Sequence, residues 1–120
     1  MQELSVLIVD DDASVQNVLC EILSDGGFLS EVACSGEEAA ALLIAKRYRM
    51  LIVDISFGRD RVEGWSIARR ARAFNPSLPI IYITGGPERD WAIHSVPNSI
   101  LLKKPFAREQ LLAAVSQLVH

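Results

Sequence analysis

Four short runs of apolar residues, each of strand length, constrain the fold of this chain more than any other feature of its sequence. The runs are Val6–Val9, Met50–Val53, Ile80–Ile83 and Ile100–Leu102, and a weaker fifth run extends from Phe28 to Ala33. Because the apolar residues are continuous and do not alternate with polar ones, each strand is expected to be covered on both faces. This pattern is typical of a parallel sheet between two layers of helices.

Segments with helical periodicity fill the gaps between these runs. Apolar residues of the first segment recur at helical spacing from Val15 to Leu23, and Gly26-Gly27 follows as a stop signal. A second helix is predicted over 39–45, because Ser35 and Glu38 have the spacing of a capping box ahead of it.

Three further helices are predicted in the second half of the chain. One extends from Gly64 to Phe74, with its arginines Arg69, Arg70 and Arg72 interpreted as a solvated face. The next is confined to about nine residues, Glu88 to Val96, because Pro97 cannot continue a helix. The last covers Ala107 to His120, with apolar residues along one side.

Five alternations of strand and helix predict a single α/β domain over residues 1–120. Such a chain forms a doubly wound five-stranded parallel sheet with helices on both faces, and the flavodoxin-like strand order 2-1-3-4-5 is expected. In sheets of this kind, ligands bind at the carboxyl ends of the strands. Those ends are therefore where functional residues are sought.

The composition argues against several classes of function for this chain. With 12 Lys and Arg against 15 Asp and Glu, the net charge of −3 argues against a direct nucleic-acid ligand. No apolar run reaches the roughly 18 residues of a membrane span, and the amino-terminal residues lack the pattern of a signal peptide, so a cytoplasmic location is expected. The two cysteines, Cys20 and Cys34, lack the spacing of a metal site and are interpreted as small core residues.

Polar residues follow four of the five predicted strands. They are Asp10-Asp11-Asp12, Asp54, Thr84-Gly85 and Lys104. Taken singly, each has an ordinary explanation as a helix cap, a loop residue or a surface charge. Because the predicted topology brings these strand ends to one edge of the sheet, a shared site is the better interpretation.

The chemistry of such a cluster is specific. Carboxylates that lie close together need a cation, and Mg²⁺ prefers one or two carboxylates together with phosphate oxygens and waters, so Asp10 and Asp11 are candidate metal ligands. Asp54 is the candidate nucleophile, which would form an acyl phosphate. The Lys104 ammonium and the Thr84 hydroxyl would stabilise the transferred phosphoryl group, and Gly85 would leave room for it.

In these residues the chain resembles the receiver domains of two-component response regulators. The matching pieces occur in family order and are Leu7–Asp12, Leu51–Asp54, Ile81–Gly85 and Leu102–Phe106. The resemblance implies that Asp54 accepts a phosphoryl group from the phosphohistidine of a histidine kinase or phosphotransfer protein, and that phosphorylation changes affinity for a downstream protein target.

The resemblance also assigns the remaining roles at the site. Mg²⁺ would be held by Asp10, Asp11, Asp54 and the backbone carbonyl of Ser56. Thr84 would bond to the phosphoryl group, Lys104 would pair with it, and the Lys104-Pro105 bond would be cis. The domain would then catalyse at most its own phosphorylation and dephosphorylation.

Two departures from the family pattern leave other readings open. Gly58 stands where receivers often have proline, in a loop about two residues longer than usual, and Leu101 replaces the usual tyrosine or phenylalanine. With the short fourth helix, these departures motivate an alternative: an interaction module that works without phosphorylation. A small Mg²⁺-dependent phosphohydrolase is disfavoured because the chain has no lid or substrate domain. Whether the chain acts alone or within a longer protein stays open.

Overall fold

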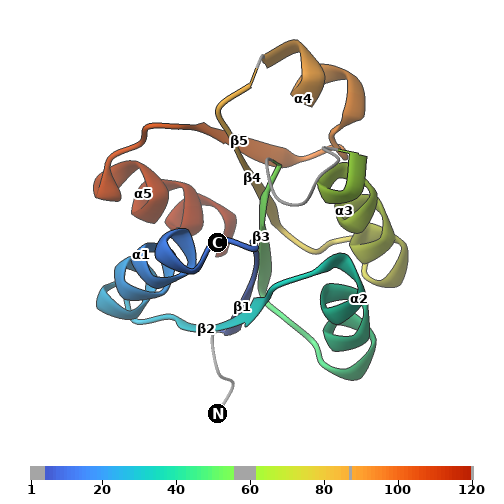
Figure 1. Ribbon diagram of the computed structural model, residues 1–120, viewed down its shortest axis with the longest axis horizontal. Coiled ribbons are helices and arrows are strands. Elements are labelled where there is room, and N and C mark those ends of the chain that lie inside the picture. The colour runs from blue at the N-terminus through green and yellow to red at the C-terminus, as the bar shows by residue number, and fades with distance from the viewer. Residues whose placement is uncertain (1–4, 56–61, 87, 120) are drawn as a thin grey trace.

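The computed structural model describes residues 5–55, 62–86 and 88–119, which form five alternating strands and helices (Figure 1). In chain order the elements are β1 (Ser5–Val9), α1 (Ala13–Asp25), β2 (Leu29–Ala33), α2 (Gly36–Ala45), β3 (Met50–Asp54), α3 (Val62–Phe74), β4 (Ile80–Thr84), α4 (Glu88–His94), β5 (Ser99–Lys103) and α5 (Arg108–Val119). None of the helices in these ranges is both long and apolar enough to cross a membrane.

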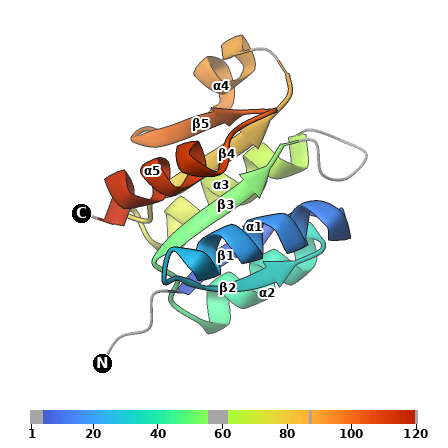
Figure 2. The same cartoon turned by 90° about the vertical axis from the view of Figure 1, so that its left-hand side faces the viewer.

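The five strands form one parallel sheet in the order β2-β1-β3-β4-β5. Helices α1 and α5 cover one face of the sheet, and α2 and α3 cover the other, with α4 next to the β5 edge (Figures 1 and 2). The predicted fold class and strand order are confirmed.

Side chains of alternate residues in each central strand pack in two separate hydrophobic cores, one on each face of the sheet. In β3, Leu51 and Val53 pack in the core under α2 and α3, whereas Met50 and Ile52 pack in the core under α1 and α5. Every residue of β3 and β4 is buried. Continuous apolar runs are therefore the sequence signature of strands covered on both faces, as expected.

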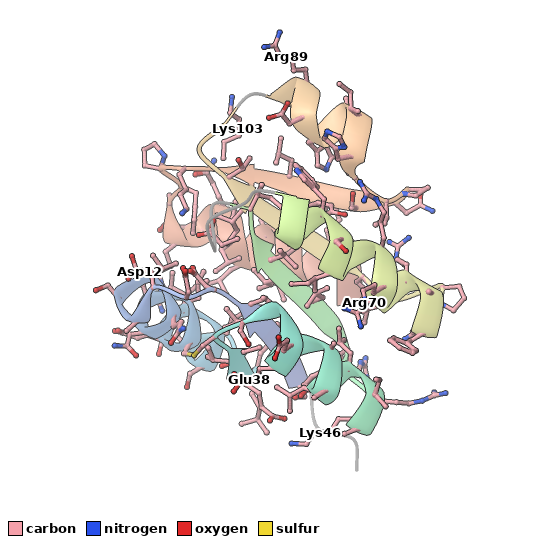
Figure 3. All side chains as sticks on the ribbon, turned by 45° about the vertical axis from the view of Figure 1, so that its right-hand side comes forward. Asp12, Glu38, Lys46, Arg70, Arg89 and Lys103 are labelled. Carbon is pink, nitrogen blue, oxygen red and sulfur yellow. The ribbon has the colours of Figure 1, made fainter. Side chains whose placement is uncertain are left out.

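Side-chain caps mark the starts of α1 and α2. Asp12 lies at the start of α1 (Figure 3). Its carboxylate accepts hydrogen bonds from the backbone N–H groups of Ser14, at 2.9 Å, and Val15, at 3.4 Å. Ser35 Oγ accepts from the N–H of Glu38 at 3.1 Å, as the capping pair predicts. Gly27, with φ of +87°, follows the end of α1 in a conformation that favours glycine.

Two sequence interpretations are wrong. Cys34 is exposed, whereas Cys20 is half-buried and packs against the core as predicted. Arg72 does not belong to a solvated face. Its guanidinium donates to three backbone carbonyls, those of Leu78 at 2.7 Å, Pro97 at 2.6 Å and Asn98 at 3.0 Å, and so ties α3 to the segments that precede β4 and β5.

Helix α4 is shorter than the nine residues that the position of Pro97 allows. It has seven residues and ends at His94, and the N–H of Ser95 donates to the Trp91 carbonyl at 2.9 Å. The backbone beyond it leaves the helix because the Val96 N–H donates to the Tyr82 hydroxyl at 3.1 Å. A tertiary partner, together with the proline, sets the end of the helix.

Candidate functional site

Two aspartates lie side by side at the carboxyl ends of β1 and β3. The parallel register pairs Val9 with Val53, so that Asp10 and Asp54 occupy the next equivalent positions on neighbouring strands. Each is only 2% exposed. Since Ile8 and Ile52, two residues earlier, both belong to the core under α1 and α5, strand alternation directs both carboxylates towards that side of the sheet.

The ammonium of Lys104 binds the second of these carboxylates. Lys104 Nζ lies 2.6 Å from Asp54 Oδ2, and the lysine side chain is 34% exposed. Its backbone is held as well, because the Lys104 N–H donates to the Thr84 carbonyl at 2.8 Å. The Lys104-Pro105 peptide bond is cis, as the resemblance implies. The structure thus brings together residues that are fifty positions apart in the chain.

The Asp10 carboxylate is held in an environment that disfavours its charge. Burial raises its pKa to about 6, the N–H of Asp12 opposes this by donating to Asp10 Oδ1 at 3.0 Å, and the neighbouring negative charge of Asp54 raises the pKa further. Within the described residues, Asp10 Oδ2 is buried and accepts no hydrogen bond. A buried carboxylate oxygen of this kind is an open position for a cation.

These residues fit the requirements of Mg²⁺. Across 5–55, 62–86 and 88–119, no three His, Cys, Asp or Glu side chains are grouped as a complete metal site. Mg²⁺ does not need such a cage, because it binds one or two carboxylates and completes its octahedron with waters and phosphate oxygens. The oxygens of Asp10 and Asp54 meet that need, and Asp11 is exposed at the same strand end. The predicted ligand Ser56 lies outside the described residues, as does Gly58.

Thr84 and Gly85 are at the carboxyl end of β4, as predicted. Thr84 is 6% exposed, and its hydroxyl oxygen accepts a hydrogen bond from the Gly86 N–H at 2.9 Å. Nothing lies within 4 Å of the position that a Cβ would take on Gly85. The space beside Gly85 is therefore open, which agrees with the room that the sequence interpretation required.

One contact at the site was not predicted. Gln16, on the first turns of α1, donates from Nε2 to the Asp10 carbonyl at 2.5 Å and to Cys34 Sγ at 3.5 Å. It therefore links the residues that directly follow β1 and β2. No sequence signal could have found this role, because a glutamine in the first turn of a helix is ordinary on a helix surface.

The arrangement suits phosphoryl transfer to a carboxylate. It combines a buried aspartate, an ammonium at hydrogen-bond distance from it, and a second carboxylate with an oxygen in need of a cation. Formation of an acyl phosphate requires an attacking carboxylate, a positive charge near the phosphoryl oxygens and a position for a metal ion.

Comparison with known proteins gives a consistent result. The family model of the response regulator receiver domain matches residues 6–116. Response regulator MprA of Mycobacterium ulcerans is 31% identical over 96% of this chain and 50% of its own length, and an NtrX-like response regulator of Rickettsia conorii is 28% identical over 98% of this chain and 25% of its own length. The chain thus spans a quarter to a half of the length of these curated relatives.

Solved structures agree in fold. A response regulator receiver protein from Sinorhizobium medicae has a TM-score of 0.89 at 38% identity, covering 98% of this chain and 95% of the other. A CheY-like receiver domain protein from Methanospirillum hungatei has a TM-score of 0.87 at 22% identity, covering 98% and 94% of the two chains, and this likeness bears on the fold alone.

Proposed function

The chain belongs to the response regulator receiver domains of two-component signalling, and from this premise we propose that it is switched by phosphorylation of Asp54. The donor is the phosphohistidine of a histidine kinase or phosphotransfer protein, and the phosphorylated form changes its affinity for a downstream protein. The observation that carries the proposal is the 2.6 Å contact of Lys104 Nζ with the buried Asp54 carboxylate. A cytoplasmic location is part of the same proposal.

In the transfer, an oxygen of the Asp54 carboxylate attacks the phosphorus of the donor. A P–O bond to Asp54 forms as the P–N bond to histidine breaks, and the imidazole leaves with the electron pair of that bond. The Lys104 ammonium, which contacts Asp54 beforehand, pairs with an oxygen of the transferred group. The Thr84 hydroxyl turns from the Gly86 N–H to a second phosphoryl oxygen.

Mg²⁺, when bound, neutralises the charge that gathers between phosphoryl and carboxylate oxygens. Asp10 and Asp54 would hold it together with Asp11 and the Ser56 carbonyl. The buried Oδ2 of Asp10 supports this assignment, because it accepts no hydrogen bond from the described residues. On this account the domain catalyses only its own phosphorylation and dephosphorylation.

The alternative of a phosphorylation-independent interaction module rests on two features of the chain. Leu101 and the seven-residue α4 alter the region next to the site that is expected to transmit the switch. In that case the fold would present a constant surface to its partner, and substituting Asp54 would leave partner binding unchanged.

The test is direct. Incubating the protein with Mg²⁺ and a small acyl phosphate should add the mass of one phosphoryl group in a base-labile linkage. Asp54→Asn should abolish the adduct. Asp25→Asn is the matched control, because Asp25 is an exposed aspartate paired with Arg108 at the far end of α1 and should leave the adduct intact. An adduct that survives Asp54→Asn refutes the assignment.

A further inference from the structure

Within the described part of the chain, Asp10 is held through every polar group except one. Its backbone N–H donates to the Ala33 carbonyl at 3.1 Å, and its Oδ1 accepts from the Asp12 N–H at 3.0 Å. Its backbone carbonyl accepts from Gln16 Nε2 at 2.5 Å. Among these residues Oδ2 alone accepts no hydrogen bond, and it is the oxygen that the proposed function assigns to Mg²⁺. The direction in which this oxygen points therefore depends on how firmly the other groups are held.

The Asp10 carbonyl depends on a side chain because it lies beyond the sheet. The paired residues of β1 with β2 and of β1 with β3 both end at Val9. Beyond that point a backbone carbonyl needs a donor from elsewhere. Gln16 supplies one from the first turn of α1, since side chains of a helix lean towards its amino end. The Gln16 backbone is fixed as well, because its N–H donates to the Asp12 carbonyl at 3.0 Å.

The Gln16 amide is also held from the segment that precedes α2. Nε2 donates to Cys34 Sγ at 3.5 Å, and the Cys34 N–H donates to Glu38 Oε1 at 2.8 Å. Asp12 and Glu38, near the starts of the two helices, are labelled in Figure 3. Nε2 carries two hydrogens, and its two contacts account for them. The orientation of the amide is therefore set by partners on two different segments.

Gln16 donates to this carbonyl without adding a charge. A lysine or an arginine at the same position would place a positive charge near the Mg²⁺ position and weaken the binding of the cation. A glutamate would have no proton to donate at neutral pH. A neutral amide on a long side chain is therefore well suited to hold a metal ligand in place.

We propose that Gln16 is a positioning residue for Mg²⁺ binding: by holding the Asp10 carbonyl, it fixes the rotation of the Asp10 backbone and directs Oδ2 towards the metal position. The inference rests on the proposed function, in which Mg²⁺ supports phosphoryl transfer to Asp54. Partners that orient a metal ligand typically change metal affinity about 10- to 100-fold when they are lost. Because the Gln16 contact is to the backbone of the ligand, we expect the lower end of that range.

Titration of the isotope-labelled chain with Mg²⁺ alone, followed by amide chemical shifts in NMR spectra, tests the proposal. Gln16→Met keeps the length of the side chain and removes the donor. Gln16→Asn keeps the amide and is one methylene too short to reach the carbonyl. Each variant should raise the dissociation constant of Mg²⁺ about tenfold. Asn17→Met, at the next and exposed position of α1, is the matched control and should bind Mg²⁺ like the natural chain.

A second cation distinguishes positioning from a general disturbance of the fold. Mg²⁺ demands near-ideal octahedral geometry, whereas Ca²⁺ accepts irregular coordination at longer distances. A displaced Asp10 oxygen should therefore weaken the binding of Mg²⁺ more than the binding of Ca²⁺. The same spectra show whether each variant is folded, and Gln16→Asn decides the question if Gln16→Met unfolds.

The outcomes separate the positioning role from the proposed function. Unchanged Mg²⁺ affinity in a folded Gln16 variant overturns the positioning role, as does an equal loss of affinity for Mg²⁺ and Ca²⁺, and both leave the proposed function standing. A natural chain that binds no Mg²⁺ overturns the positioning role together with the metal assignment. If the natural chain binds Mg²⁺ but forms no Asp54 adduct with a small acyl phosphate, the proposed function is overturned, and the titration still decides the role of Gln16.

Discussion

Asp10→Asn should stabilise this protein at neutral pH when no divalent cation is present. In the folded chain, burial and the charge of Asp54 raise the pKa of the Asp10 carboxyl from 3.8 to about 6. Below pH 3.8 the carboxyl is protonated in the folded and unfolded states alike and costs nothing. As the pH rises towards 6, the unfolded chain releases its proton first, so stability is lost.

The size of the effect follows from the shift. The difference between 3.8 and about 6 is roughly 2 pKa units, at about 1.4 kcal/mol for each unit. The charged Asp10 carboxylate therefore costs up to about 3 kcal/mol in the free energy of unfolding above pH 6. An asparagine has the same shape without the charge, and its amide can donate to Asp54, so most of this cost should disappear.

Urea unfolding from pH 4 to pH 8, followed by circular dichroism, measures the difference. The two proteins should be nearly equal in stability at pH 4, and the variant should gain progressively up to pH 7. Adding Mg²⁺ should stabilise the natural chain and have little effect on the variant. If the variant is less stable at pH 7, or if its gain does not depend on pH, the raised pKa and the unpaired carboxylate do not govern this site.

Three other substitutions test the packing that positions the site. Ser35→Ala should cost about 1 kcal/mol in urea unfolding, because it removes the α2 cap, whereas Ser24→Ala, an exposed site within α1, should change little. Arg72→Gln should cost about 2 kcal/mol by losing donors to three carbonyls, and the exposed Arg70→Gln is its control. Leu111→Ala, at a fully buried position of α5, should cost about 2–5 kcal/mol and lower the midpoint of thermal unfolding. The contacts described would be contradicted if Ser35→Ala were as stable as Ser24→Ala, or Arg72→Gln as stable as Arg70→Gln. A Leu111→Ala variant with unchanged stability would contradict the burial of Leu111.

The sheet and most of the site could be predicted from the sequence, because both follow from where each strand ends along the chain. Strand-length apolar runs fix where each strand ends, and parallel pairing then carries Asp10, Asp54 and Lys104 to one edge. The roles of Arg72 and Gln16 could not be found in this way. The partners of Arg72 include carbonyls 25 and 26 residues along the chain, and helical spacing alone places the arginine on a polar face.

Strand periodicity also predicts the face of the sheet on which the Thr84 side chain lies. The register pairs Asp54 with Ile83, so Thr84 is one residue further along β4 and its side chain points to the opposite face of the sheet. Asp54 therefore belongs to the side of α1 and α5, whereas Thr84 continues the line of Tyr82 towards α3 and α4. A phosphoryl group on Asp54 can reach the Thr84 hydroxyl only across the end of the sheet. In the proposed function, that crossing links a modification on one face of the sheet to a residue on the other face, although the sheet between them is fully packed.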